Sequence, residues 1–176
     1  AFVLANVGPT VSPEQAVRAV EMIGADALQV HLNAAQELVM PEGDRDLRHW
    51  SRGVADIAAA VDVPVVVKEV GFGLSRRTVE TLAGCGVDAV DVAGAGGTDF
   101  IAIENARRPD QDYSYLSGWG QPTALCLLEA LGGEDPRLPV LASGGVRNPL
   151  DVVRCLALGA CAVGVSGHFL RTLSGR

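Results

Sequence analysis

The stretch LPVLASGGVR, residues 138–147, decides how this chain folds. It joins a short apolar strand to a pair of glycines, and a helix expected over Asn148–Leu158 follows. Glycines let backbone N–H groups approach an anion, and the N-terminus of a helix adds a favourable dipole. The stretch therefore predicts a buried strand whose carboxyl end can hold a phosphate group.

The same unit, an apolar strand followed by a polar or glycine-rich loop and then a helix, recurs along the chain. The expected strands are Ala1–Leu4, Ala27–Val30, Pro64–Val67, Ala89–Val92, Pro139–Leu141 and Ala162–Val165. The other expected helices are Pro13–Ile23 with Ser12 as its N-cap, Leu47–Val61, a helix from the cap Ser75 to Ala83, Pro122–Leu131 and a short segment at Gly167–Leu170. A polar stretch, Arg107–Gly120, breaks the rhythm and is either a packed loop or a lid.

Strict alternation of strands and helices predicts a parallel sheet with right-handed crossovers. A doubly wound open sheet and a (β/α) barrel both satisfy this pattern. No G-x-G-x-x-G motif follows the first strand, and functional-looking residues end nearly every strand, which favours the barrel. A full barrel has eight units in about 250 residues. We therefore expect one domain, residues 1–176, that is an incomplete (β/α)8 TIM barrel with strands three to eight, lacking its first two strands and its last helix.

Composition limits the classes of partner. The formal net charge of −7 disfavours nucleic acid and anionic membranes as partners. No apolar run reaches the roughly 18 residues that a membrane span needs. The four cysteines lack C-x-x-C spacing, which is typical of free thiols in a reducing compartment, and we expect a cytoplasmic protein.

Polar side chains gather where the second expected strand ends. His31 and Asn33 are two residues apart and share a face of the strand, and Gln36 and Glu37 are expected in the loop after it. Such a cluster can orient a substrate, move a proton or hold a metal. Mg²⁺ commonly takes one or two carboxylates together with waters and substrate phosphates. The alternative is a polar loop with a capping histidine and a solvated glutamate.

Lys68 lies at the end of a strongly apolar strand, so its charge needs a partner at the barrel mouth. Candidates are a carboxylate such as Glu69 or Asp91, a substrate that forms a Schiff base, or an electron-rich cofactor ring. A lysine beside N1 and C2=O of a flavin would stabilise the reduced, anionic ring. A structural ion pair is the alternative reading.

Two further loops extend the phosphate site that residues 143–147 predict. The sequence DVAGAGGT at residues 91–98 is glycine-rich, and the hydroxyl of Thr98 could bind a phosphate, although a tight turn explains the glycines equally well. Barrel phosphate sites are often built from the loops after strands seven and eight with a short extra helix. If two strands precede this chain, Ser143–Arg147 follows strand seven and Ser166–His168 follows strand eight.

Taken together, these motifs resemble the type 2 isopentenyl-diphosphate isomerase family of FMN-dependent (β/α)8-barrel enzymes. The matching pieces are ANVG at 5–8, HLNAAQE at 31–37, KEVGFGLS at 68–75, DVAGAGGT at 91–98, SGGVR at 143–147 and ALGA at 157–160. The resemblance implies that Asn6 and Lys68 contact the flavin. It implies that the residues around the flavin, mostly near its phosphate, are Thr98, Gly144, Gly145, Arg147, Ser166 and Gly167. The family often has a serine where this chain has Ala93.

The resemblance also implies a substrate pocket and a reaction. His31 and Gln36 line the pocket as the catalytic candidates, Asn33 helps to bind the diphosphate, and Glu37 holds Mg²⁺. The implied reaction interconverts isopentenyl and dimethylallyl diphosphate with reduced FMN, which NADPH supplies with electrons, in a homo-oligomer. The rivals are another FMN-dependent oxidoreductase, acting on a hydroxy acid or a nucleotide, and a fragment that keeps the fold without turnover.

Overall fold

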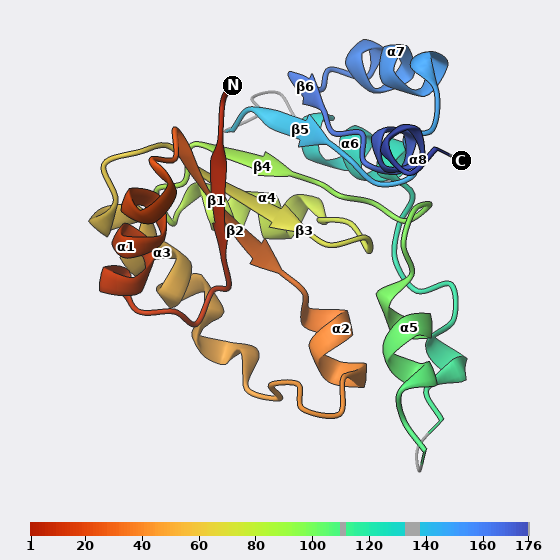
Figure 1. The fold of residues 1–176 in the computed structure, drawn as a ribbon, viewed down its shortest axis with the longest axis horizontal. Coiled ribbons are helices and arrows are strands. Elements are labelled where there is room, and N and C mark those ends of the chain that lie inside the picture. The colour runs from red at the N-terminus through yellow and green to blue at the C-terminus, as the bar shows by residue number, and fades with distance from the viewer. Residues whose placement is uncertain (110–111, 133–137, 176) are drawn as a thin grey trace.

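Six parallel strands form one sheet in the computed structural model, which describes residues 1–109, 112–132 and 138–175 (Figure 1). The strands are β1 (Leu4–Val7), β2 (Ala27–Leu32), β3 (Val65–Glu69), β4 (Ala89–Asp91), β5 (Val140–Ala142) and β6 (Ala162–Val163). Each strand pairs in parallel with the next, so their order in the sheet is their order in the chain.

This sequential order decides between the two architectures. A doubly wound sheet reverses its strand order at a switch point, whereas a barrel adds each strand beside the one before it. The described strands run β1 to β6 without a reversal, so they form an arc of a (β/α) barrel and the barrel prediction is confirmed. The further strands and the last helix of the expected barrel stay a prediction.

Helices connect the strands and cover one face of the arc. They are α1 (Pro13–Ile23), α2 (Ala34–Val39), α3 (Trp50–Ala60), α4 (Arg76–Ala83), α5 (Phe100–Ala106), α6 (Thr123–Leu131), α7 (Pro149–Ala157) and α8 (Gly167–Leu173), with short 3-10 turns η1 (Leu47–His49) and η2 (Ser114–Leu116). Figure 1 shows α2 and α5 apart from this layer, beyond the ends of β2 and β4. No helix in the described ranges is both long and apolar enough to cross a membrane.

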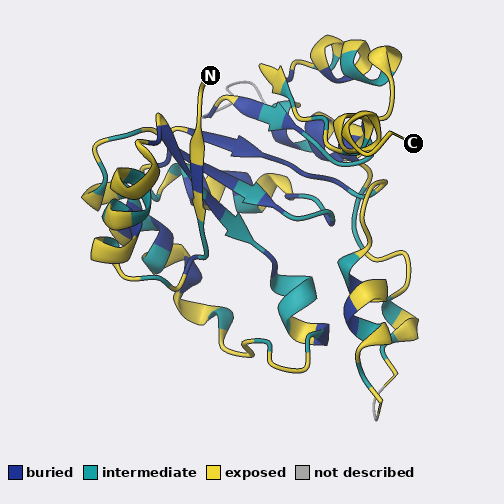
Figure 2. Cartoon of the chain, in the orientation of Figure 1, coloured by how far each residue is buried: buried dark blue, intermediate teal, exposed yellow. Residues whose placement is uncertain are grey.

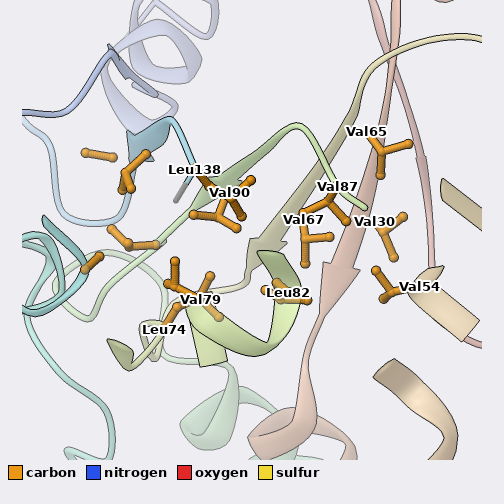
Figure 3. Close-up of a cluster of buried hydrophobic side chains, with 14 of the residues drawn as sticks. Val30, Val54, Val65, Val67, Leu74, Val79, Leu82, Val87, Val90 and Leu138 are labelled. Atoms are coloured by element: carbon orange, nitrogen blue, oxygen red, sulfur yellow. The ribbon is translucent and has the colours of Figure 1, made fainter. Parts of the chain in front are cut away.

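The core lies between the strands and this helical layer. Alternate strand residues, among them Val30, Val67 and Val90, are fully buried against helix residues such as Val54 and Leu82 (Figure 3). Figure 2 shows that burial is greatest in the middle strands and that α7 and α8 are largely exposed. Side chains alternate along a strand, so the neighbours of each of these valines on its own strand face the opposite side, which is the inner side of the arc.

Helix boundaries follow the caps that the sequence contains. Ser12 Oγ accepts from the backbone N–H of Gln15 at 3.3 Å, and Gln15 Oε1 accepts from the N–H of Ser12 at 2.9 Å, which makes a capping box. Gly24 ends the helix with φ of 58°. The side chains of Ser75 and Asn148 accept from the backbone N–H groups of Thr78 and Asp151 and cap α4 and α7, so these predicted helix starts are confirmed.

Several expected boundaries are wrong. The first strand is Leu4–Val7 instead of Ala1–Leu4, because the strand aligns with β2 from Ala27 onward and Leu4 is the residue opposite Ala27. The third strand continues to Glu69, and the sixth stops at Val163. The expected helix Leu47–Val61 is divided into η1 and α3.

Two helices were not expected at all. Residues 34–39, AAQELV, form α2, so Gln36 and Glu37 lie on a helix instead of in a loop, and Asn33 is at its start instead of in the strand. All but the last of these six residues are good helix formers. Helix α5 begins after Asp99, whose Oδ1 accepts from the N–H of Ala102 at 3.0 Å.

The stretch Arg107–Gly120 contains residues 110 and 111, which lie outside the described residues. Of the remainder, Tyr113 and Leu116 pack against a small cluster of Val39, Phe72 and Ile101. These contacts favour the packed-loop interpretation over a lid.

Candidate active site

A row of polar side chains crosses the inner face of the arc at the carboxyl ends of the strands. His31 on β2 is opposite Lys68 on β3, which is opposite Asp91 on β4. Asn6 continues the row on β1, and Ser143 continues it just after β5. Ser143 Oγ lies 2.9 and 2.8 Å from the two carboxylate oxygens of Asp91 and donates to them. Neighbouring strands thus present amide, imidazole, ammonium, carboxylate and hydroxyl groups to one space.

A cleft of about 720 Å³ lies over the second half of this row. Small-molecule sites commonly measure about 300–1,000 Å³. Its wall is made by the ends of β3 to β6 and the loops that follow them: Lys68, Val70, Gly71, Asp91, Ala93, Gly94, Gly96, Gly97, Thr98, Phe100, Ser143, Gly144, Gly145, Val146, Arg147, Gly164, Val165, Ser166, Gly167 and Arg171. The cleft can therefore hold one medium-sized ligand along the carboxyl ends of the strands.

The glycine pair in the loop after β5 is required by the loop after β4. Gly144 and Gly145 have φ of 92° and 72°, which side chains rarely adopt. A Cβ atom on Gly144 would lie 2.0 Å from the carbonyl oxygen of Gly94, and one on Gly145 would lie 2.9 Å from the carbonyl carbon of Gly96. The two glycine loops are stacked backbone on backbone, and this packing shapes the cleft wall.

Thr123 and Asp91 hold the stacked loops in place. Thr123 Oγ1 lies 2.9 and 2.7 Å from the carbonyl oxygens of Ser143 and Gly144, and Asp91 Oδ1 accepts from the N–H of Ala93 at 3.0 Å. Ala93 is in the left-handed region, with φ of 39°. The Asp91 hydrogen bond helps to hold this unfavourable conformation.

Cationic and hydroxyl side chains line part of the cleft. Arg147, Arg171, Thr98 and Ser166 are all exposed there, and Arg147 Nη2 donates to the carbonyl oxygen of Gly96 at 2.9 Å. Guanidinium groups, hydroxyls and glycine N–H groups are donors suited to phosphate. This donor set therefore fits the phosphate of a ligand, and Lys68 at the end of β3 lines the same cleft.

Lys68 does not pair with Glu69. Its Nζ donates to the backbone oxygen of Glu69 at 2.5 Å, whereas Glu69 Oε2 accepts from the N–H groups of Val70, Gly71 and Phe72 at 2.7, 2.7 and 2.5 Å. Burial raises the pKa of the Glu69 carboxyl despite these donors. Among the described residues Lys68 forms no ion pair, so its charge is available to a ligand in the cleft.

His31 belongs to a chain of three side chains on the first two strands. His31 Nδ1 lies 2.8 Å from Asn6 Oδ1, and Asn6 Nδ2 donates to Gln29 Oε1 at 3.0 Å. Burial and then the charge of Lys68 lower the pKa of His31, and they outweigh the opposite effects of Glu37 and the Val7 carbonyl. The imidazole is therefore neutral at neutral pH.

Helix α2 brings the remaining candidates to the same end of the arc. Asn33 Nδ2 donates to Glu37 Oε1 at 2.9 Å, and Glu37 Oε2 accepts from the N–H of Asp44 at 2.6 Å. Gln36 Nε2 donates to Glu104 Oε1 at 3.0 Å. Within the described ranges no three His, Cys, Asp or Glu side chains form a metal cluster, so a metal at Glu37 would need ligands from substrate and water.

The predicted site residues thus fall into two groups. Of the expected cofactor set, the members on or after β3 line the cleft: Lys68, Thr98, Gly144, Gly145, Arg147, Ser166 and Gly167. The others lie outside its wall, toward β1 and α2: Asn6, His31, Asn33, Gln36 and Glu37. Lys68 stands between the two groups, beside His31.

Sequence reasoning missed two residues whose side chains contact the second group. Gln29 interrupts an apolar strand two positions before His31, and this polar residue at an inward position was a usable signal. Glu104 is only 5% exposed and contacts both Gln36 and Arg107. It lies 68 positions from Gln36 on a helix that was not expected, so no local pattern could have found it.

A parallel arc with sequential strands and a phosphate-type cleft at their carboxyl ends defines a ligand-binding (β/α)-barrel protein. Residues 7–175 match the model of the FMN-dependent dehydrogenase family. The chain belongs to this family.

Curated relatives are similar over nearly the whole chain. An isopentenyl-diphosphate delta-isomerase of Streptomyces sp. (strain CL190) is 61% identical over 172 residues, which cover 98% of this chain and 47% of the relative. The enzyme of the same name from Nocardia farcinica (strain IFM 10152) is 57% identical, with 99% and 48% covered. That from Listeria monocytogenes serotype 4a (strain HCC23) is 52% identical, with 98% and 48% covered. The chain spans about half the length of these relatives.

Proposed function

We propose that this protein is an FMN-dependent isopentenyl-diphosphate isomerase, which interconverts isopentenyl and dimethylallyl diphosphate in isoprenoid biosynthesis. The observation that carries the proposal is the position of Lys68. This lysine lines the phosphate-type cleft and is also opposite His31, which belongs with Gln36 to the second group of predicted site residues. This arrangement suits a bound cofactor and a substrate that meet at one lysine. The similarity to relatives of that name, at 61% identity, supports it.

The cleft fits the proposed flavin. Thr98, Arg147 and Ser166, with the glycine N–H groups, would hold the FMN phosphate, and Lys68 and Asn6 would contact the ring. Support comes from the exposed guanidinium groups of Arg147 and Arg171 in the cleft wall and from the Lys68 ammonium group, which has no ion-pair partner among the described residues. When bound, reduced FMN supplies a proton-transferring ring without net redox change, and NADPH would keep it reduced.

The second group would bind the substrate. Asn33 would contact the diphosphate, and Glu37 would bind Mg²⁺ together with diphosphate oxygens and waters. His31 and Gln36 would line the pocket of the hydrocarbon end, where uncharged side chains cost less to bury than charged ones. The lowered pKa of His31 and the hydrogen bond from Gln36 to Glu104 support uncharged, oriented groups at this place.

A different FMN-dependent oxidoreductase is the second candidate, because the matching family is described as FMN-dependent dehydrogenase. Such an enzyme would oxidise a hydroxy acid or a nucleotide and would leave the flavin reduced after one turnover. An inactive fragment would instead bind no flavin, so flavin absorbance of the purified protein separates it from both enzymes.

The decisive experiment incubates the FMN-loaded protein anaerobically with a reductant, MgCl₂ and isopentenyl diphosphate. We expect dimethylallyl diphosphate, detected by proton NMR, in an amount that exceeds the amount of flavin. Absence of product from flavin-loaded protein overturns the proposal. Flavin bleaching by a hydroxy acid, without isomerisation, would support the dehydrogenase instead.

We also propose a cytoplasmic location and a homo-oligomeric assembly. The location is supported by the four cysteines, Cys85, Cys126, Cys155 and Cys161, all of which are free thiols. The assembly is a prediction that sedimentation of the FMN-loaded protein would test.

A further inference from the structure

Gln29 has no role in the function proposed above. It is nevertheless the first of three side chains that are linked by hydrogen bonds, and His31 is the last. It is half-buried on β2, and its register partner on β1 is Asn6. Both side chains face the inner side of the arc, as His31 does two residues further along the strand. The three side chains are joined by hydrogen bonds of 3.0 and 2.8 Å.

The order of donors and acceptors in this chain has a chemical consequence. An asparagine amide has an NH₂ group that only donates and an oxygen that only accepts. Because Asn6 Nδ2 donates to Gln29 Oε1, Asn6 turns its oxygen toward His31 Nδ1. An acceptor at this distance requires the proton of the neutral ring to be on Nδ1, which leaves the lone pair on Nε2 open.

The groups around His31 are compatible with a neutral ring. Lys68 faces it from β3 and lowers its pKa, whereas Glu37 on α2 and the Val7 carbonyl on β1 act in the opposite direction. The second N–H of the Asn6 amide remains available for the proposed flavin contact. The hydrogen bonds to Gln29 and His31 therefore do not prevent Asn6 from binding the flavin.

We propose that Gln29 is a positioning residue that fixes, through Asn6, which ring nitrogen of His31 carries the proton. The open lone pair of Nε2 then accepts a hydrogen bond or a proton in the pocket. The role of this lone pair in turnover rests on the proposed function, whereas the position of the proton does not.

The test is nitrogen NMR of the FMN-loaded protein without substrate, at pH 8, where His31 is neutral. The chain has three histidines, so removing His49 and His168 in turn assigns the signals. Long-range proton–nitrogen correlation distinguishes a protonated ring nitrogen from a bare one. We expect the proton on Nδ1 in the wild-type protein.

Two substitutions separate positioning from a merely structural role. Gln29→Met removes the acceptor at similar volume, so Asn6 can turn and His31 should populate both tautomers. Gln29→Glu only accepts, so it should retain the Nδ1 proton. We expect kcat about three- to tenfold lower in Gln29→Met, with recovery in Gln29→Glu, as suits the loss of one ordinary hydrogen bond.

Several results would overturn the inference. These are a wild-type proton on Nε2, a proton that moves to Nε2 in Gln29→Glu, or unchanged nitrogen shifts in a folded Gln29→Met protein. If Gln29→Met does not fold, Gln29→Ala removes the same acceptor, and unchanged nitrogen shifts in that variant overturn the inference. If the shifts agree and no isomerisation occurs, the positioning role stands and the isomerase proposal fails.

Discussion

At the scale of single residues, the sharpest constraints are on glycines whose hydrogen atoms point at another backbone. Gly145 has φ of 72° and would place a Cβ atom 2.9 Å from the carbonyl carbon of Gly96. Gly24 has a similar φ of 58°, but nothing lies within 4 Å of its position for a Cβ atom. A comparison of Gly145 with Gly24 therefore separates the energetic cost of a left-handed backbone from the energetic cost of a clash between the packed loops.

Gly145→Ala should therefore destabilise the protein more than Gly24→Ala. We expect about 1–2 kcal/mol for Gly24→Ala, the ordinary cost of a left-handed alanine. Gly145→Ala adds a backbone clash and should also weaken FMN binding at least tenfold. Urea unfolding and flavin fluorescence titration measure the two effects. Equal stability losses and equal flavin affinities would contradict the role of loop stacking in the cleft.

His31 should make stability depend on pH. Its folded pKa is lowered from 6.5, so between 6.5 and that lower value the unfolded chain binds more protons than the folded one. The contribution is full above pH 6.5 and is lost as pH falls through this window. Urea unfolding from pH 8 to pH 5 should show a smaller acid loss in His31→Gln than in the wild type. The exposed His49→Gln should follow the wild type.

Glu37→Gln should raise the Mg²⁺ concentration needed for half-maximal activity at least tenfold, because an amide is a weaker ligand than a carboxylate for a hard cation. Flavin affinity should change less than twofold. Titration of activity with MgCl₂ and of fluorescence with FMN gives both values. Equal losses would mean that Glu37 serves mainly to accept from Asn33 and Asp44.

The limits of sequence reasoning are visible at this scale. The polar residues that end each strand were identifiable because lysine, histidine and asparagine stand out after apolar runs. The sequence suggests the carboxylate of Glu69 as a partner for Lys68, whereas this carboxylate accepts from the backbone of its own loop. Adjacent charges in a sequence do not reveal whether the backbone competes for one of them.

At the scale of elements, α2 and α5 form a unit that stands apart from the alternating strands and helices. The two helices pack together, and Glu104 joins Gln36 on α2 to Arg107 beyond the end of α5. Arg107 also pairs with Glu42 at 2.6 Å. This unit sets the position of Gln36 and Glu37 over the row of strand-end residues.

Glu104→Gln should lower kcat about ten- to hundredfold, as expected for the loss of a buried charge-assisted hydrogen bond of about 1.5–3 kcal/mol. Glu42→Gln is the matched control, because it removes the exposed partner of Arg107 and leaves Gln36 untouched. Steady-state kinetics of both variants would decide the matter. A similar loss in both variants would assign the effect to Arg107 and the helix pair.

Neither helix of this unit was expected, and the reason is length. Helices of six and seven residues carry too few turns for a periodic apolar pattern, so residues 34–39 and 100–106 resembled loops. The longer helices, with serine or asparagine caps, were located well. Prediction thus succeeded for the elements that build the arc and failed for those that complete the pocket.

At the scale of the whole molecule, the described arc has two free edges, β1 and β6. Apolar side chains are exposed on α7 and α8 beside the second edge, among them Val153 at 59%, Phe169 at 61% and Leu173 at 86%. Unpaired edges and exposed apolar surface promote association. Alternation predicted a parallel α/β fold, and the functional-looking residues at the strand ends favoured a barrel, but the strand order that confirms the barrel required the structure.

The 176-residue chain should therefore associate as its concentration rises. The double variant Phe169→Ser with Leu173→Ser should reduce this association. Met22→Ser on α1 is the control, because Met22 is equally exposed, at 75%, but lies away from α7 and α8. Analytical ultracentrifugation over a hundredfold range of concentration measures the difference. An equal effect of both changes would assign association to general hydrophobicity.

The agreement between strand order and chain order has a consequence for synthesis on the ribosome. Each strand after β1 finds its partner in the strand made immediately before it, and no strand must wait for a later one. Each step closes only the connection between two consecutive strands, and closure entropy grows only slowly with the length of that connection. Translation at about 5–20 residues per second leaves seconds for each unit to dock. The arc can grow from its amino end while the ribosome is still adding residues.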